Sequence, residues 1–349
     1  MIDFKEALTY DDILLVPKFS DIESRSEVDI GNDLDKYTKL DLPIISSPMD
    51  TITESEMAYE MSRHGGLGVV HRYNSIEEQS GIIRELHNSF AAEKIASNIA
   101  FATGITGDYF ERARAGWENG ANIICLDVAH GHHSMMKGTI EKIKMEFGPK
   151  LHIMAGNVAT LEGFNDLADW GADSIRCNIG GGSICSTRVQ TGHGMPGLQT
   201  IFDCARSDRN AKIIADGGIR SGGDIVKALA AGADFVMVGS LLAGTDETPG
   251  EVVSTGPHHL GRKQKVYRGM ASKDAQMQWR GRYSSNEGIT TYVDYKGPVG
   301  SILQDLKNAI SSGLSYSGAR SIEELQSVAT FVRQTSAGLG ESKTHILRK

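Results

Sequence analysis

The chain has 349 residues, 40% of them hydrophobic, and its formal net charge at pH 7 is −8. It has no Lys/Arg-rich block or basic stripe, which argues against a nucleic-acid partner, and no apolar run approaches the roughly 18 residues that a membrane span needs. The four cysteines stand outside any CxxC pattern, and the N-terminal residues do not form a signal-peptide pattern, so we expect a cytoplasmic protein without disulfides or a zinc site.

Eight short apolar runs recur along the chain, and each is followed by a segment of helical periodicity. In chain order they are 42–46, 67–70, 95–100, 122–127, 151–156, 174–178, 212–216 and 234–238. Strands that are apolar on both faces and alternate with helices imply a parallel sheet. The pattern predicts a (β/α)8 TIM barrel forming one catalytic domain over 1–349, with short terminal extensions and no inserted regulatory domain. A doubly wound open sheet is the alternative.

In such a barrel the reactive groups follow the C-terminal ends of the strands. The residues at these positions are Ser47, His71, Asp127, Gly156, Asn157, Asn178, Asp216, Gly239 and Ser240.

Glycine-rich loops follow the seventh and eighth runs, "ADGGIRSGGDI" (215–225) and "VGSLLAG" (238–244). Each opens a predicted helix, where backbone N–H groups and the helix dipole favour a phosphate. Asp216, ahead of the glycines, can accept hydrogen bonds from a ribose diol. Together the two loops predict a site for a nucleotide monophosphate, although glycines that only make tight turns are the alternative.

Cys185 stands in a third glycine-rich loop, "NIGGGSICSTR" (178–188), after the sixth run. Most isolated cysteines are buried and structural. This one follows three consecutive glycines at the predicted mouth of the barrel, where backbone amides can stabilise a thiolate. Ser186 and Thr187 place hydroxyl groups beside it that can relay protons. The loop therefore predicts a nucleophile.

Several ordered motifs resemble the IMP dehydrogenase/GMP reductase family over residues 7–345. They are "SSPMDT" (46–51), "LDVAHGH" (126–132), "MAGNVAT" (154–160), "GGGSICSTR" (180–188), "ADGGIRSGGDI" (215–225) and "YRGMASKDAQ" (267–276). The resemblance implies a barrel, usually tetrameric, whose cysteine attacks C2 of a purine nucleotide. A nicotinamide cofactor then gives or takes a hydride at C2.

The resemblance also implies roles for individual residues. Cys185 matches the nucleophile, Thr187 the proton-relaying threonine and Glu287 the carboxylate paired with it. The implied substrate contacts are Ser47, Met49, Asn157, Ser183, Asp216, Gly217, Gly218, Gly239, Ser240, Gly269, Met270, Ala271, Ser285 and Gly288. The implied cofactor contacts are Asp127, Val128, Ala129, Ile179 and Gly180. A potassium ion is expected at the carbonyls of Gly180, Gly182 and Cys185, with Arg188 nearby.

The two branches of the family run the chemistry in opposite directions. Residues 271–286 are short for a dehydrogenase flap, and they bring the pair Arg282-Tyr283 close to Glu287, while "YSSNEG" (283–288) resembles the reductases. In contrast, "QTSAGLGES" (334–342) resembles the dehydrogenases. We therefore predict an NADPH-dependent reductase that converts GMP to IMP and ammonia, as a homotetramer. An IMP dehydrogenase without the regulatory insert is the alternative, and a non-catalytic nucleotide sensor is a more distant one.

Overall fold

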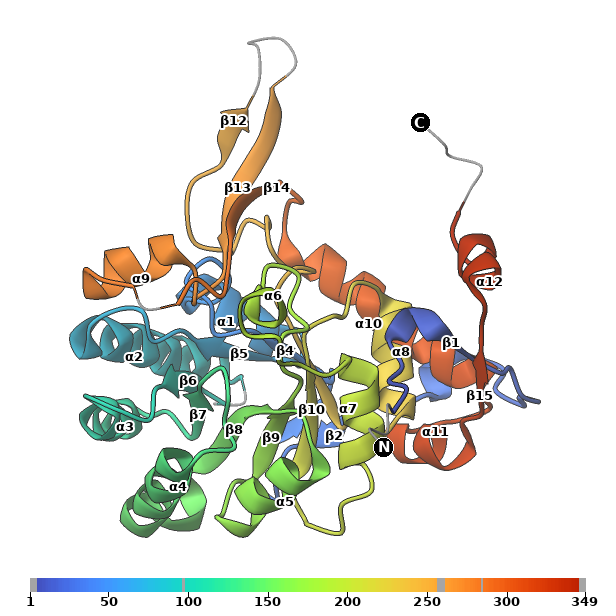
Figure 1. Ribbon diagram of the computed structural model, residues 1–349, viewed down its shortest axis with the longest axis horizontal. Helices are drawn as coiled ribbons and strands as arrows, with labels where there is room; N and C mark the ends of the chain where they lie inside the picture. The colour runs from blue at the N-terminus through green and yellow to red at the C-terminus, as the bar shows by residue number, and fades with distance from the viewer. Residues whose placement is uncertain (1–4, 96–97, 256–260, 284, 345–349) are drawn as a thin grey trace.

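Eight parallel strands close into a barrel in the computed structural model, which describes residues 5–95, 98–255, 261–283 and 285–344 (Figure 1). The strands pair around the barrel in the order β10-β11-β4-β5-β6-β7-β8-β9. Their bounds are β4 Ile44–Ser46, β5 Leu67–Val70, β6 Ala100–Thr103, β7 Ile123–Asp127, β8 His152–Val158, β9 Ser174–Cys177, β10 Lys212–Asp216 and β11 Phe235–Val238. The predicted (β/α)8 barrel is thus confirmed, and the open sheet is excluded because β11 pairs with β4.

Helices surround the barrel and alternate with its strands. They are α1 Ser55–Arg63, α2 Ile76–Glu93, α3 Tyr109–Glu118, α4 Ser134–Phe147, α5 Leu161–Asp169, α6 Thr187–Thr191, α7 Gly197–Cys204, α8 Gly222–Ala230 and α10 Val299–Tyr316. Side-chain caps start several of them, such as the reciprocal capping box of Ser75 and Glu78 at α2. None of the helices in the described ranges is both long and apolar enough to cross a membrane.

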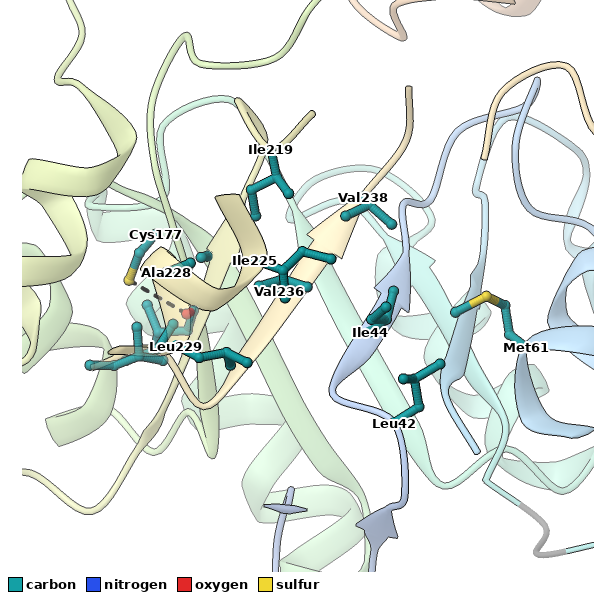
Figure 2. Close-up of a cluster of buried hydrophobic side chains, with 14 of the residues drawn as sticks. Leu42, Ile44, Met61, Cys177, Ile219, Ile225, Ala228, Leu229, Val236 and Val238 are labelled. Carbon is teal, nitrogen blue, oxygen red and sulfur yellow. Dashed lines mark hydrogen bonds between the residues drawn. The ribbon is translucent and has the colours of Figure 1, made fainter. Parts of the chain in front are cut away.

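The helices bury their apolar faces against the outside of the strands. Figure 2 shows this layer beside α8, where Ile225 and Leu229 point from the helix toward Val236 of β11. All three side chains are fully buried. The alternation of strand and helix in the sequence is therefore explained, because neither layer covers its apolar surface without the other.

The third strand lies further along the chain than predicted. The apolar run 95–100 contains residues 96–97, which lie outside the described residues, and the strand itself is β6, Ala100–Thr103. Ala100 and Phe101 pair with Ile123 and Ile124 of β7, and all four residues of β6 are buried. The prediction was wrong because alanine has a low strand propensity, so "AFAT" was not recognised as a strand.

A short N-terminal hairpin closes the barrel at the end where its strands begin. The hairpin consists of β2 (Asn32–Asp33) and β3 (Lys39–Leu40). Leu34 and Leu40 join the cluster of side chains inside the barrel and are almost fully buried. Asp35, in the turn, lies 2.7 Å from Nδ1 of His152, the first residue of β8.

The remaining elements lie outside the barrel. β1 (Ile13–Leu15) pairs with β15 (Phe331–Arg333), and β12 (Val253–Thr255), β13 (Arg262–Arg268) and β14 (Thr290–Asp294) form a small antiparallel sheet that projects away from the barrel in Figure 1. The other short helices are η1 Tyr10–Asp12, η2 Arg25–Glu27, η3 Gly148–Lys150, α9 Lys273–Arg280, α11 Ile322–Val328 and α12 Ser336–Glu341.

Candidate active site

A cavity of about 260 Å³ lies at the end of the barrel where the strands finish. Most of the predicted site residues line it, namely Ser47, Met49, Asp127, Val128, Ala129, Asn157, Ile179, Gly180, Gly182, Ser183, Cys185, Thr187, Asp216, Gly217, Gly218, Gly239, Ser240, Gly269, Met270, Ala271 and Glu287. These residues come from loops far apart in the sequence, which the closed barrel brings to one face.

Five predicted residues do not line this cavity, namely Gly156, Ser285, Gly288, Arg188 and His71. The Ser285 carbonyl accepts a hydrogen bond from Gln276 Nε2 at 2.6 Å, so this residue braces the flap. Gly288 packs behind the wall, because a Cβ there would lie 3.2 Å from the Gly269 Cα. Arg188 donates hydrogen bonds to the Ile179 carbonyl, in the loop that carries Cys185. His71, predicted at the mouth, is buried instead and lies 2.8 Å from Glu54 Oε1.

Cys185, Thr187 and Glu287 form a continuous chain of polar contacts. The Cys185 Sγ lies 3.2 Å from the Thr187 Oγ1, which donates a hydrogen bond of 2.9 Å to the Glu287 Oε2. Backbone bonds fix this geometry, because the Ser186 amide donates to the Glu287 carbonyl at 3.0 Å. A nucleophile, a hydroxyl and a carboxylate in this order can transfer a proton between the reacting atom and the carboxylate.

Cys185 differs from the other cysteines of the chain in its surroundings. It is exposed, whereas Cys125, Cys177 and Cys204 are buried. Burial raises the pKa of the Cys125 thiol to about 12 and holds the pKa of the Cys177 thiol well above its ordinary range. Neither thiol forms the reactive thiolate at neutral pH, so Cys185 is the cysteine suited to attack a substrate.

The glycine-rich loops pack too closely to accept side chains. Gly217 has a φ of +83°, and a Cβ there would lie 3.2 Å from the Gly182 amide nitrogen. At Gly239 a Cβ would lie 3.2 Å from both the Met49 Sδ and the Tyr267 Oη. At Gly217 glycine is favoured by the positive φ and by the close approach together, whereas at Gly239 only the close approach disfavours a side chain. Backbone amides in such loops suit a phosphate group.

An arginine inside the barrel wall holds the two carboxylates of the site. Arg176 is 6% exposed, and its guanidinium contacts Asp127 at 2.6 Å and Asp216 at 2.8 Å. Burial would by itself raise the pKa of Asp127, but the charges of Arg176 and Arg72 hold that pKa below its usual range. The carboxylates of Asp127 and Asp216 can therefore accept hydrogen bonds from hydroxyl groups such as those of a ribose ring.

Several residues of the cavity wall were not predicted from the sequence, namely Pro48, Tyr73, Arg176, Ile184, Ile219 and Tyr267. Of these, Arg176 had a visible signal, because it is the one charged residue in the predicted strand 174–178. A charged side chain within a buried strand needs partners and marks a candidate site.

The flap helix α9 does not line the cavity itself but contacts Tyr73 of the cavity wall. The Trp279 ring lies 6.0 Å from the Tyr73 ring between centroids, and Gln278 accepts a hydrogen bond of 2.7 Å from Arg268. Tyr283, which follows the helix, is 50% exposed, and the Lys273 ammonium lies 4.9 Å from its ring centroid. Neither Arg282 nor Tyr283 lines the cavity.

The predicted potassium loop is braced by a side chain of its own. Arg188 donates to the Ile179 carbonyl at 3.2 Å and also to the Met195 carbonyl. The Gly182 carbonyl accepts from the Cys185 amide at 3.1 Å. A cationic group thus already lies among the carbonyls beside the proposed ligands, and the potassium ion stays a prediction.

Comparisons of sequence and of structure both match known proteins over nearly the whole chain. Residues 7–345 match the family described as "IMP dehydrogenase / GMP reductase domain". The chain is 33% identical to inosine-5'-monophosphate dehydrogenase of Nitrosopumilus maritimus, covering 99% of both proteins, and 35% identical to GMP reductase of Ascaris suum, covering 96% of this chain and 95% of the relative. A crystal structure of a GMP reductase variant from Trypanosoma brucei in complex with guanosine 5'-monophosphate superposes with a TM-score of 0.91 at 30% identity, covering 98% of both chains.

Proposed function

Because the chain belongs to the IMP dehydrogenase/GMP reductase family, we propose that it catalyses the NADPH-dependent reductive deamination of GMP to IMP and ammonia. The observation that carries this proposal is the contact chain from Cys185 through Thr187 to Glu287. It supplies a nucleophile for C2 of the purine and an acid for the amine that leaves C2.

The residues act on the nucleotide in sequence. The Cys185 sulfur forms a bond to C2 of GMP, and Glu287, acting through the Thr187 hydroxyl, delivers a proton to the 2-amino group. The C2–N bond then breaks, ammonia leaves with the proton that the thiol gave up, and the purine remains bound to Cys185 as a thioimidate. Asp216 and the glycine loops hold the ribose and phosphate during these steps, which keeps C2 within reach of the sulfur.

We place the nicotinamide cofactor at the part of the cavity wall that follows β7. Asp127, Val128 and Ala129 would hold it, and the ionised Asp127 carboxylate fits a ribose hydroxyl donor. When bound, NADPH would supply the hydride to C2; the C2–S bond then breaks, which releases IMP, and the sulfur of Cys185 takes up a proton. The flap α9 and the ring of Tyr73 limit access of water, which would otherwise hydrolyse the covalent purine.

The position of Arg282 and Tyr283 supports the reductase direction. A dehydrogenase must activate water after the cofactor leaves, and the resemblance assigns that task to an Arg-Tyr pair. Here both residues lie outside the cavity wall, and Tyr283 is half exposed beside Lys273. Overall identity does not separate the branches, since the relatives named for the two activities are 33% and 35% identical to this chain.

A paired assay tests the direction. We expect GMP with NADPH to give loss of NADPH absorbance and release of ammonia in equal amounts. Turnover of IMP with NAD and no turnover of GMP would reverse the assignment to IMP dehydrogenase. Failure of both reactions, with nucleotide binding intact, would favour the sensor. Repeating the assay with potassium and with sodium tests the predicted cation, and light scattering tests the proposed homotetramer.

A further inference from the structure

One buried guanidinium connects the nucleotide side of the cavity to the cofactor side. Arg176 lies on β9, Asp216 ends the adjacent strand β10, and Asp127 ends β7, two strands away on the other side. The Arg176 Nη1 contacts Asp127 Oδ1 at 2.6 Å, while Nη2 and Nε contact Asp216 Oδ2 at 2.8 and 3.1 Å. The planar guanidinium therefore fixes the distance between the two carboxylates.

Each carboxylate uses one oxygen for this contact and leaves the other for a ligand. Asp216 Oδ2 accepts from Arg176 and from Asn157 Nδ2 at 2.8 Å, whereas no hydrogen bond from the described residues reaches its Oδ1. Asp127 Oδ2 lies 3.6 Å from the Arg72 Nε, too far for a hydrogen bond. Both remaining oxygens belong to residues that line the cavity.

The charge of Arg176 is secure in this position. Burial would lower the pKa of its guanidinium, but Asp216, Cys125 and Asp127 hold that pKa well above its ordinary value. A buried charge that contacts two carboxylates is costly to displace. A ligand that orders either carboxylate must therefore also order the guanidinium and, through it, the other carboxylate.

We propose that Arg176 is a positioning residue that couples binding of the nucleotide to binding of the cofactor. The inference rests on the proposed function, which places a ribose at each carboxylate. The first ligand orients its own carboxylate and, through Arg176, the other carboxylate, so the protein loses less conformational freedom when the second ligand binds. Each ligand then tightens the other by the same factor, because coupling is reciprocal.

Calorimetry of the intact protein tests the coupling. The Kd of NADP⁺ is measured without GMP and with saturating GMP; oxidised NADP⁺ has no hydride to give, so GMP is not reduced to IMP in the ternary complex. For the wild type we expect GMP to tighten NADP⁺ binding by about fivefold or more. In Arg176→Lys the charge remains, but one ammonium group cannot contact both carboxylates in the way that the planar guanidinium does. We expect GMP to change the NADP⁺ affinity of this variant by less than about twofold, so that most of the coupling is lost.

Arg72→Lys is the matched control. Arg72 also lies beside Asp127, where its Nη2 donates to the backbone carbonyl at 3.1 Å, but no described contact joins it to Asp216. We expect this variant to bind NADP⁺ more weakly and to keep the wild-type coupling. Equal NADP⁺ affinity with and without GMP in the wild type, or full coupling in Arg176→Lys, overturns the proposal. So does an equal loss of coupling in Arg72→Lys.

A second variant serves if Arg176→Lys does not fold, as circular dichroism would reveal. Asp127→Asn keeps Arg176 and weakens one end of the connection, so GMP should tighten NADP⁺ binding to this variant by less than about twofold. Full wild-type coupling in Asp127→Asn contradicts the proposal. All these measurements need binding alone, so a wild type that binds both ligands without reducing GMP refutes the proposed function while the coupling is still measured.

Discussion

The Thr187 Oγ1 lies 2.9 Å from the Glu287 Oε2, although the two residues stand 100 positions apart in the chain. Thr187 begins α6 directly after the cysteine loop, and Glu287 ends the segment that returns from the flap. The two segments are joined by backbone bonds, including the bond from the Ile289 amide to the Ile184 carbonyl at 3.1 Å. The carboxylate therefore keeps its place relative to the nucleophile only while the flap base stays paired with the cysteine loop.

Replacing Glu287 by glutamine tests the role of this contact. The amide keeps the shape and the hydrogen-bonding reach of the carboxylate but cannot transfer a proton. We expect kcat for GMP reduction to fall by about 10²–10⁴-fold, the usual size of general acid–base assistance. The Kd of GMP, measured by calorimetry, should change far less.

The double variant Thr187→Val with Glu287→Gln is the control for that experiment. Residues that act as one unit are non-additive, so the pair should cost little more in kcat than either change alone. Fully additive losses would mean that the two residues act separately. An unaltered kcat for Glu287→Gln would direct attention to Arg282 and Tyr283 as a water-activating pair.

Cys185→Ala should abolish turnover and leave nucleotide binding within about tenfold of the wild type, because the phosphate and ribose contacts lie on other loops. Mass spectrometry with 6-chloropurine ribotide gives a direct readout. The wild type should gain one covalent adduct that maps to Cys185, and the variant none. An adduct on a buried cysteine, or a loss of GMP binding, would give Cys185 a structural role instead.

The contact between Asp35 and His152, at the end of the barrel where its strands begin, should make the free energy of unfolding depend on pH. Partial burial would raise the pKa of Asp35, but hydrogen bonds from His152 and from the Tyr37 amide hold it below its ordinary value. This contribution is complete above the unfolded pKa of about 3.9 and is lost as the pH falls through the lower folded pKa.

Asp35→Asn should therefore lower the free energy of unfolding at pH 7 by about 1–3 kcal/mol, the range for hydrogen bonds to charged groups. Urea titrations of both proteins at several pH values check this. The difference in the free energy of unfolding between the two proteins should become smaller below a pH of about 4. A difference that stays constant down to acidic pH would show that the carboxylate charge contributes nothing.

Gly116 and Gly138 form a matched pair of helical glycines with opposite expectations. A Cβ on Gly116 would lie 2.4 Å from the Cζ of Phe101, which is fully buried, whereas a Cβ on Gly138 meets no heavy atom within 4 Å. Gly116→Ala should destabilise by about 1–3 kcal/mol through overpacking. Gly138→Ala should stabilise by up to about 1 kcal/mol through helix propensity. Urea denaturation of both variants gives the comparison, and a more stable Gly116→Ala protein would contradict it.

Sequence patterns predicted the barrel well because its strands are continuous apolar runs, a local property of the chain. They failed at β6, where alanines replace β-branched residues. They also placed the His71 side chain at the mouth of the barrel, although it is buried beside Glu54. Arg176 was missed for a different reason. Its significance depends on Asp127 and Asp216, which only the closed barrel brings to its two ends.

The pairing of β1 with β15 has a consequence for synthesis of the protein. Ile13 to Leu15 pair with Arg333 to Phe331, and Tyr10, just before them, lines a cavity beside the glycine loop at Gly218. All eight barrel strands, β4 to β11, lie between β1 and β15 in the chain. The ribosome therefore makes the barrel strands before it makes the partner of β1, so the segment that carries Tyr10 takes its final place only after them.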